Sequence, residues 1–163
     1  MTEIGTLVIV VLKAKDLPDK HFYKQDVFAQ VTLNGTSKRT KLDVKGGQHP
    51  LWDEEIRFPV YKDTTAKHRT LEVECFSKET RSDESVGKGS VDISDTLKTG
   101  EFDDWVPLSL NNVQRGEIFL EMTYFASGPA PIQRRPSKMN PSERMWRPPQ
   151  TSPAKTPPKG TSP

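Results

Sequence analysis

The residues best suited to chemistry in this sequence are serines and threonines near its C-terminal end. Ser152-Pro153-Ala154-Lys155 and Thr156-Pro157-Pro158-Lys159 are consecutive Ser/Thr-Pro-x-Lys units, the form that cyclin-dependent kinases favour. Ser162-Pro163 is a minimal site of the same type, and Arg134-Arg135-Pro136-Ser137 has the Arg-Arg-x-Ser form of basophilic kinase sites. A phosphate adds about −1.5 to −2 charges, so modification would change the electrostatics of this region strongly. The predicted phosphorylation sites are Ser137, Ser152, Thr156 and Ser162.

Side chains that carry catalysis or hold a metal ion form no pattern here. Cys75 is the single cysteine, which excludes an intrachain disulfide framework, and it alternates with aliphatic neighbours as a core residue does. His21, His49 and His68 are too scattered for a metal triad or a Ser-His-Asp arrangement. We therefore expect no enzymatic activity, no bound metal and no cofactor.

A short basic stretch is the other candidate site. Each basic residue near an anionic membrane is worth about 1 kcal/mol, so four give weak, salt-sensitive binding to lipid head groups. Exposed strands also carry charge simply to discourage edge pairing, and this alternative stays open. Phe22 and Tyr23, in an earlier loop, either insert into a membrane interface or pack beneath their own loop. The basic residues are Lys38, Arg39, Lys41 and Lys45.

The elements that must position these groups fall into two parts. Residues 127–163 hold ten of the 14 prolines and no Leu or Val, so folding could not offset the loss of backbone entropy. They carry seven Lys and Arg against one acidic residue, but Trp146 as their one aromatic side chain makes a poor platform for nucleic-acid bases. We expect a folded domain over residues 1–126 and a disordered, basic, proline-rich tail over 127–163, without nucleic-acid binding.

The folded part reads as β-structure, because apolar residues recur with period two in short runs between Gly, Asn, Asp and Pro. Asn34-Gly35 is a two-residue hairpin signal, which predicts that the second and third strands pair. A short helical turn fits within residues 92–99. The longest apolar run, Leu7 to Leu12, is far shorter than the roughly 20 residues of a membrane-spanning helix. The predicted strands are 6–14, 27–33, 37–42, 55–60, 70–76, 86–93, 105–110 and 116–125.

An ordered set of motifs makes this region similar to a C2 domain. The motifs are Leu7-x-Ile9-x-Val11 at the start, His49-Pro50-Leu51-Trp52-Asp53-Glu54 in the middle, and Gly116-Glu117-Ile118 before the last strand. The resemblance covers about residues 4–125. It implies an all-β, eight-stranded antiparallel sandwich, and the direct start with the Leu7-x-Ile9-x-Val11 strand resembles the type II arrangement.

The resemblance also implies where calcium would bind, in a cup of five acidic positions. Calcium needs about 6–8 oxygen ligands. Asp26 and Glu84 are acidic, but two positions hold lysine and one holds phenylalanine, so we expect a degenerate, calcium-independent cup. The five positions are Lys20, Asp26, Phe76, Lys78 and Glu84.

The N-terminal domain, the Gly-Glu-x-x-Leu-Glu-Met-Thr-Tyr ending and the basic tail together resemble the fungal ingression-family C2 proteins of cytokinesis. This resemblance implies a cytoplasmic, non-enzymatic adaptor at the division site and inner plasma membrane, coupling the actomyosin ring to membrane ingression and septum formation. It implies SH3-containing or F-BAR scaffolds as partners, although no two tail prolines have the PxxP spacing. The alternative is a peripheral module that recognises anionic phospholipids in signalling or trafficking.

Overall fold

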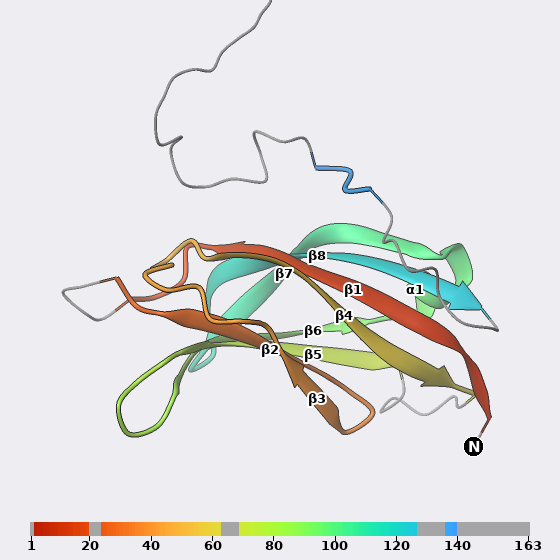
Figure 1. The fold of residues 1–163 in the computed structure, drawn as a ribbon, viewed down its shortest axis with the longest axis horizontal. Helices are drawn as coiled ribbons and strands as arrows, with labels where there is room; N and C mark the ends of the chain where they lie inside the picture. Colours follow the sequence, from red (N-terminus) through yellow and green to blue (C-terminus); the bar gives the residue numbers. More distant parts are fainter. Residues whose placement is uncertain (1, 20–23, 63–68, 127–135, 140–163) are drawn as a thin grey trace, which may run out of the picture.

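Two layers of four antiparallel strands stack face to face (Figure 1). The computed structural model describes residues 2–19, 24–62, 69–126 and 136–139. Within these ranges the elements are β1 (Glu3–Lys15), β2 (Val27–Leu33), β3 (Thr36–Arg39), β4 (Leu51–Tyr61), β5 (Thr70–Ser77), β6 (Glu84–Asp92), α1 (Ser94–Thr99), β7 (Glu101–Leu110) and β8 (Val113–Ala126).

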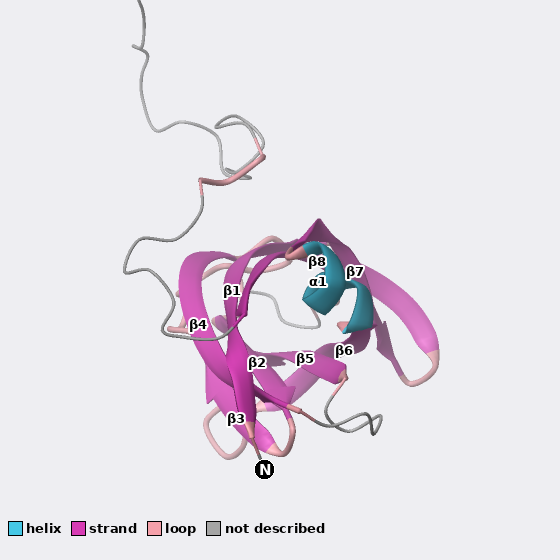
Figure 2. Cartoon of the chain, turned by 90° about the vertical axis from the view of Figure 1, so that its right-hand side faces the viewer, coloured by secondary structure: helices cyan, strands magenta, loops and turns pink. Residues whose placement is uncertain are grey.

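The strand order is β3-β2-β5-β6 in one layer and β7-β8-β1-β4 in the other. A single paired position, Lys88 with Ser109, joins β6 to β7 where the sheet passes from one layer to the next. Figure 2 shows the two layers on either side of the core, with α1 beside β7 and β8. The predicted all-β, eight-stranded antiparallel sandwich is confirmed.

The core lies between the layers and is built by the period-two pattern of the strands. On β8, the alternating apolar residues Ile118, Leu120 and Met122 are fully buried. Trp52 on β4 packs against this core, and its indole nitrogen donates a hydrogen bond of 3.1 Å to the Val27 carbonyl on β2. The indole therefore ties one layer to the other.

The central strand β1 is buried on both sides, unlike a strand with one solvated face. Its inward residues join the main core, while Val10 and Leu12 belong to a second apolar cluster with Phe119 of β8. Trp105 of β7 packs edge-on against Phe119, with 5.2 Å between ring centroids. Because these side chains lie on the opposite side of the sheet from the main core, the outer face of this layer carries an apolar cluster.

The Asn34-Gly35 hairpin is formed as predicted. Both residues have positive φ, 51° and 79°, and β2 pairs with β3 from Leu33 and Thr36 outward. A second turn of the same kind, Asn111-Asn112, joins β7 to β8 with φ of 53° and 66°. Asn tolerates this left-handed region better than most residues, which fixes both turns locally.

Some strand ends differ from the prediction. β3 ends at Arg39 rather than at residue 42, because the Thr40 hydroxyl accepts a hydrogen bond from the Ala29 amide and interrupts the regular ladder. β7 begins at Glu101 rather than at Trp105, since its polar first residues pair with β8. Long-range pairing therefore extends strands into residues whose own pattern is not strand-like.

In the part of the chain that the structure describes, α1 is the one helix, and its six residues are too few to cross a membrane. Residues 136–139, from the segment predicted to be disordered, lie against the β7-β8-β1-β4 layer. The remainder of the predicted tail lies outside the described residues.

Candidate functional site

Loops that follow β1, β3 and β5 meet at one end of the sandwich and form the candidate site. The buried Gln25 side chain fastens two of them, donating from Nε2 to the Pro18 carbonyl at 2.9 Å and to the Gly47 carbonyl at 3.1 Å. The third loop is held where the Lys78 amide donates to the Asp26 carbonyl at 2.8 Å. These bonds join the three loops into one surface.

Asp26, the acidic position nearest the loop junction, has a structural partner. Its carboxylate accepts a hydrogen bond of 2.8 Å from the Lys45 amide, and Lys45 adopts a left-handed φ of 58°. The Asp26 side chain therefore holds the β3–β4 loop in place. Lys20, its expected counterpart, lies outside the described residues, as do Phe22 and Tyr23.

Phe76 does not point into the loop junction. It lies on the outer face of its layer, stacked on Phe28 with ring centroids 5.2 Å apart. The alternation of β5 explains its direction, because Leu71, Val73, Cys75 and Ser77 are buried and Phe76 lies between two of them. The partner strand β6 has a β-bulge here, since Cys75 pairs with Gly87 and Phe76 with Ser85, which leaves Val86 as an extra residue.

The remaining loop positions pair among themselves. The Lys78 ammonium lies 3.6 Å from the Asp83 carboxylate, and the Ser77 hydroxyl donates to Glu79 at 2.7 Å. Glu84 begins β6 and is half-buried. Across the described ranges, no three His, Cys, Asp or Glu side chains are grouped closely enough to hold a metal ion.

The basic residues of and near β3 diverge instead of forming one patch. The Lys38 ammonium reaches across to β4, donating to the Arg57 carbonyl at 2.6 Å and lying 5.2 Å from the Phe58 ring centroid. The Arg39 guanidinium lies over the outer face, 4.9 Å from the Phe28 ring centroid, and donates to the Gln30 side chain. Lys38 therefore bridges two sheet edges, whereas Arg39 belongs to an outer aromatic stack.

Lys41 and Lys45 flank an exposed apolar pair that the sequence pattern did not single out. Leu42 is 38% exposed and Val44 is 61% exposed, in the loop between β3 and β4. Both flanking lysines are exposed as well. The sequence alternates charged and apolar residues here, as Lys41-Leu42-Asp43-Val44-Lys45. The same alternation is equally typical of a half-buried strand, so it does not by itself predict that Leu42 and Val44 are exposed.

Of the side chains considered for catalysis, Cys75 and His49 are described, and His21 and His68 lie outside the described residues. Cys75 is fully buried in β5, and burial, followed by the nearby Glu74 carboxylate, raises the pKa of its thiol. A thiol with a raised pKa is a poor nucleophile at neutral pH. His49 accepts a hydrogen bond of 3.3 Å from the Asp16 amide, which is a loop contact.

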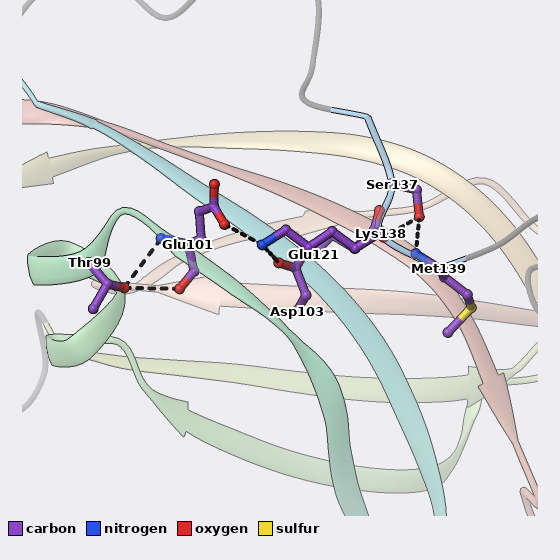
Figure 3. A network of polar contacts seen from close by, with 7 residues as sticks. All are labelled: Thr99, Glu101, Asp103, Glu121, Ser137, Lys138 and Met139. Carbon is purple, nitrogen blue, oxygen red and sulfur yellow. Dashed lines mark hydrogen bonds and ion pairs between the residues drawn. The ribbon is translucent and has the colours of Figure 1, made fainter.

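Of the predicted phosphorylation sites, Ser137 is described and contacts the sandwich. Its hydroxyl donates a hydrogen bond to the Glu121 carboxylate on β8, far from the loop end (Figure 3). Ser152, Thr156 and Ser162 lie outside the described residues. The structure therefore brings Lys45 and Asp26 into contact, places Lys41 in the same loop as Lys45, and leaves Phe76 and Ser137 elsewhere.

Comparisons with known proteins agree with this architecture. The family model of the C2 domain matches residues 5–108. Extended synaptotagmin-1 of Homo sapiens is 30% identical over 131 residues, covering 74% of this chain and 11% of that protein. Ingression protein fic1 of Schizosaccharomyces pombe is 24% identical over 137 residues, covering 83% of this chain and 49% of that protein. The chain thus spans about a tenth of the one relative and half of the other.

Solved structures support the fold. A single C2 domain of plant extended synaptotagmin 1 superposes with a TM-score of 0.66 at 21% identity, covering 79% of this chain and all of that one. A pair of C2 domains from extended synaptotagmin 2 with calcium bound gives a TM-score of 0.67 at 22% identity, covering 77% of this chain and 47% of that one. At these identities the likeness establishes the fold alone.

Proposed function

The chain belongs to the C2 domain family, and from this premise we propose that it is a non-enzymatic adaptor that docks at the inner plasma membrane during cytokinesis. The observation that carries the membrane part is the exposed pair Leu42 and Val44 between Lys41 and Lys45 at the loop end. The cytokinesis part is supported by the similarity to ingression protein fic1 and by the basic tail.

The loop between β3 and β4 has the composition of an interfacial tip. Apolar side chains gain free energy on leaving water, about 25 cal/mol per Å² of buried apolar area, and Leu42 and Val44 already project from the fold. Flanking ammonium groups attract anionic head groups, at about 1 kcal/mol each near a charged surface. The loop therefore suits shallow insertion into an anionic membrane, with a contribution from charge that salt screens.

The fastening of the loop favours such contact. Asp26 holds Lys45 by its amide, and Gln25 holds Gly47, so the tip is positioned before any lipid arrives. A positioned loop loses less conformational entropy on binding than a free one. The proposed mode of binding therefore does not rely on a cation to order the tip.

Co-sedimentation with vesicles of phosphatidylcholine, with and without phosphatidylserine, tests the proposal. Leu42→Ser with Val44→Ser should abolish sedimentation, and Lys41→Glu with Lys45→Glu should weaken it at least about thirtyfold, because two favourable charges of about 1 kcal/mol each are lost. The matched control is Val113→Ser with Lys88→Glu, which changes an exposed apolar residue and an exposed lysine away from the loop end. Control and parent should sediment alike.

Absence of sedimentation by the parent chain on anionic vesicles would overturn the membrane part of the proposal. Docking on protein would then be the surviving function. Affinity purification from dividing cells tests that part, and enrichment of SH3-containing or F-BAR scaffolds is the expected result. Enrichment of unrelated proteins alone would contradict the adaptor role.

A second function, a lipid-binding module in membrane trafficking, is favoured by the similarity to extended synaptotagmins. It shares the loop end with the first proposal but does not require the division site. Imaging of the fluorescently tagged chain through the cell cycle separates the two. Accumulation at the division site supports the adaptor, whereas a constant cortical distribution supports trafficking.

A further inference from the structure

A segment that follows the last strand, residues 136–139, lies on the outer face of the β7-β8-β1-β4 layer, and we call it the docked segment. Its contacts come from Ser137, Lys138 and Met139. The Ser137 hydroxyl donates to the Glu121 carboxylate, and the Met139 amide donates to the Ser137 hydroxyl at 3.2 Å. The Lys138 ammonium lies 2.6 Å from Glu101 and 3.6 Å from Asp103 (Figure 3). Each of these three residues thus has a partner on the sandwich or within the docked segment.

The docked segment also covers apolar surface. Met139 packs against the cluster of Val10, Leu12 and Phe119, with Trp105 at its side. These strand residues lie on the outer side of the sheet, where none of the described strands forms a further layer over them. A methionine side chain suits such an irregular surface, because it is flexible and its sulfur contacts aromatic rings favourably.

Among the described residues, the carboxylates that the sandwich presents to Ser137 favour a hydroxyl donor over an anion. Glu121 is 5% exposed, and a carboxylate buried to this degree is stabilised by hydrogen-bond donors. On the neighbouring strand β7, Asp103 is paired in register with Glu121. The cations nearest on β1, Lys13 and Lys15, have their ammonium groups 5.9 Å and 4.4 Å from the Trp105 ring centroid. Lys138 belongs to the docked segment itself.

We propose that Ser137 is a phosphorylation site whose modification releases the docked segment from the sandwich. The residues before it, Arg134-Arg135-Pro136, give the sequence that basophilic kinases favour. In the reaction the Ser137 oxygen bonds to the γ-phosphorus of ATP, the bond from that phosphorus to ADP breaks, and the hydroxyl proton passes to the kinase's base. The kinase takes its substrate from the undocked population, so phosphorylation traps that state.

Release follows from the change of charge and of hydrogen bonding. Phosphorylation removes the hydrogen that Ser137 donates to Glu121 and places about −1.5 to −2 charges at a site bordered by two carboxylates. Lys138 is a single positive charge, and it is already engaged by Glu101 and Asp103. The expected result is at least about a tenfold fall in the docked population, and exposure of the cluster beneath Met139.

Methyl NMR of the full chain with 13C-labelled methionine tests the proposal. The sequence has four methionines, and the Met139 methyl should be displaced from its free position by the ring currents of Phe119 and Trp105. After treatment with a basophilic kinase and ATP, mass spectrometry should find phosphate on Ser137, and the Met139 methyl should move to its position in the unfolded chain. Ser137→Asp should move it part of the way without kinase.

Two matched variants make the result specific. Ser137→Ala removes the acceptor of phosphate, so kinase treatment should leave its Met139 signal unchanged. Ser142→Asp adds the same charge five positions further along the chain and should leave Met139 docked. A free Met139 signal in the unmodified chain would overturn the proposal, as would a docked signal in the phosphorylated chain, in which case Lys13 and Lys15 hold the phosphate. Failure of the kinase to modify Ser137 would overturn it too.

Discussion

The two outer faces of the sandwich contain four strands each, yet they meet their surroundings differently. On the β7-β8-β1-β4 side, Val10, Leu12 and Phe119 are buried and the docked segment adds Met139 as a cover. On the β3-β2-β5-β6 side, polar side chains alternate with the core residues, and the aromatic pair of Phe28 and Phe76 lies beneath the Arg39 guanidinium.

This difference teaches how a sheet face is completed. An antiparallel layer with one solvated face needs no cover beyond its own alternation of apolar and polar residues, and the β3-β2-β5-β6 layer follows that rule. The other layer carries apolar residues on both sides of β1, so its outer face needs contacts from elsewhere in the chain. Of the two faces, the β7-β8-β1-β4 face is the one that the described part of the tail, residues 136–139, contacts.

The largest expected effect is a difference in stability between matched aromatic truncations on the two faces. Phe119→Ala should lower the free energy of unfolding by about 3–5 kcal/mol, because a buried ring and its edge-on contact with Trp105 are lost. Phe76→Ala should cost about 1–2 kcal/mol, since that half-exposed ring contributes mainly its stacking on Phe28. Denaturant titration of both variants measures the difference, and equal losses would contradict it.

The free energy of unfolding should fall at alkaline pH, because Cys75 lies in the core between the two layers. Burial raises the pKa of the Cys75 thiol above its ordinary value of 9.0, so above that pH the unfolded chain loses this proton while the folded chain keeps it. The folded state binds more protons there, and stability must fall as pH rises, by about 2 kcal/mol between pH 8 and pH 10.5.

Denaturant titrations across this pH range measure the slope, with Cys75→Ala as the control that removes the thiol. The control should be less stable at pH 8, because a buried group is lost, but its decline with pH should be shallower than that of the parent. Parallel declines would show that the slope comes from other groups. The raised pKa of the partly buried Tyr124 acts in the same direction and remains in the control.

Removal of residues 127–163 tests the coupling of one face to the tail. The chain of residues 1–126 should still unfold cooperatively, because all eight strands are retained. Its free energy of unfolding should fall by about 1–2 kcal/mol, from loss of the Met139 contacts and of a surface ion pair worth about 0.2–1 kcal/mol. An unchanged free energy of unfolding would show that the covered face does not depend on the docked segment.

The smallest expected effect concerns calcium at the loop end, where the two layers are joined by loops. Millimolar calcium should leave the melting temperature unchanged, because a ligand raises stability only through a site in the native state. Asp26 is engaged with the Lys45 amide, and Lys78 places a positive charge beside Asp83. Differential scanning calorimetry with calcium and with a chelator compares the two states, and a rise of several degrees would reject the expectation.

The sequence alone determined the class of fold, the bounds of β2 and the hairpin at Asn34-Gly35. These features depend on local patterns: apolar residues at every second position, and a turn that needs two residues tolerant of positive φ. The apolar face of β8 was predictable for the same reason, since Ile118, Leu120 and Met122 occupy alternate positions. The basic and acidic loop residues were found by type, but their directions were not.

Tertiary structure decided the features that depend on distant partners. The bulge at Val86 arises from the pairing of β5 with β6 rather than from the residue itself, whereas the outward direction of Phe76 follows from the alternation within β5. The exposure of Leu42 and Val44 depends on where β3 stops, which the Thr40 contact with Ala29 sets. The docking of Ser137 on Glu121 joins two residues whose own neighbours give no sign of the contact, because complementary charge and apolar surface are assembled only when β1, β7 and β8 lie side by side.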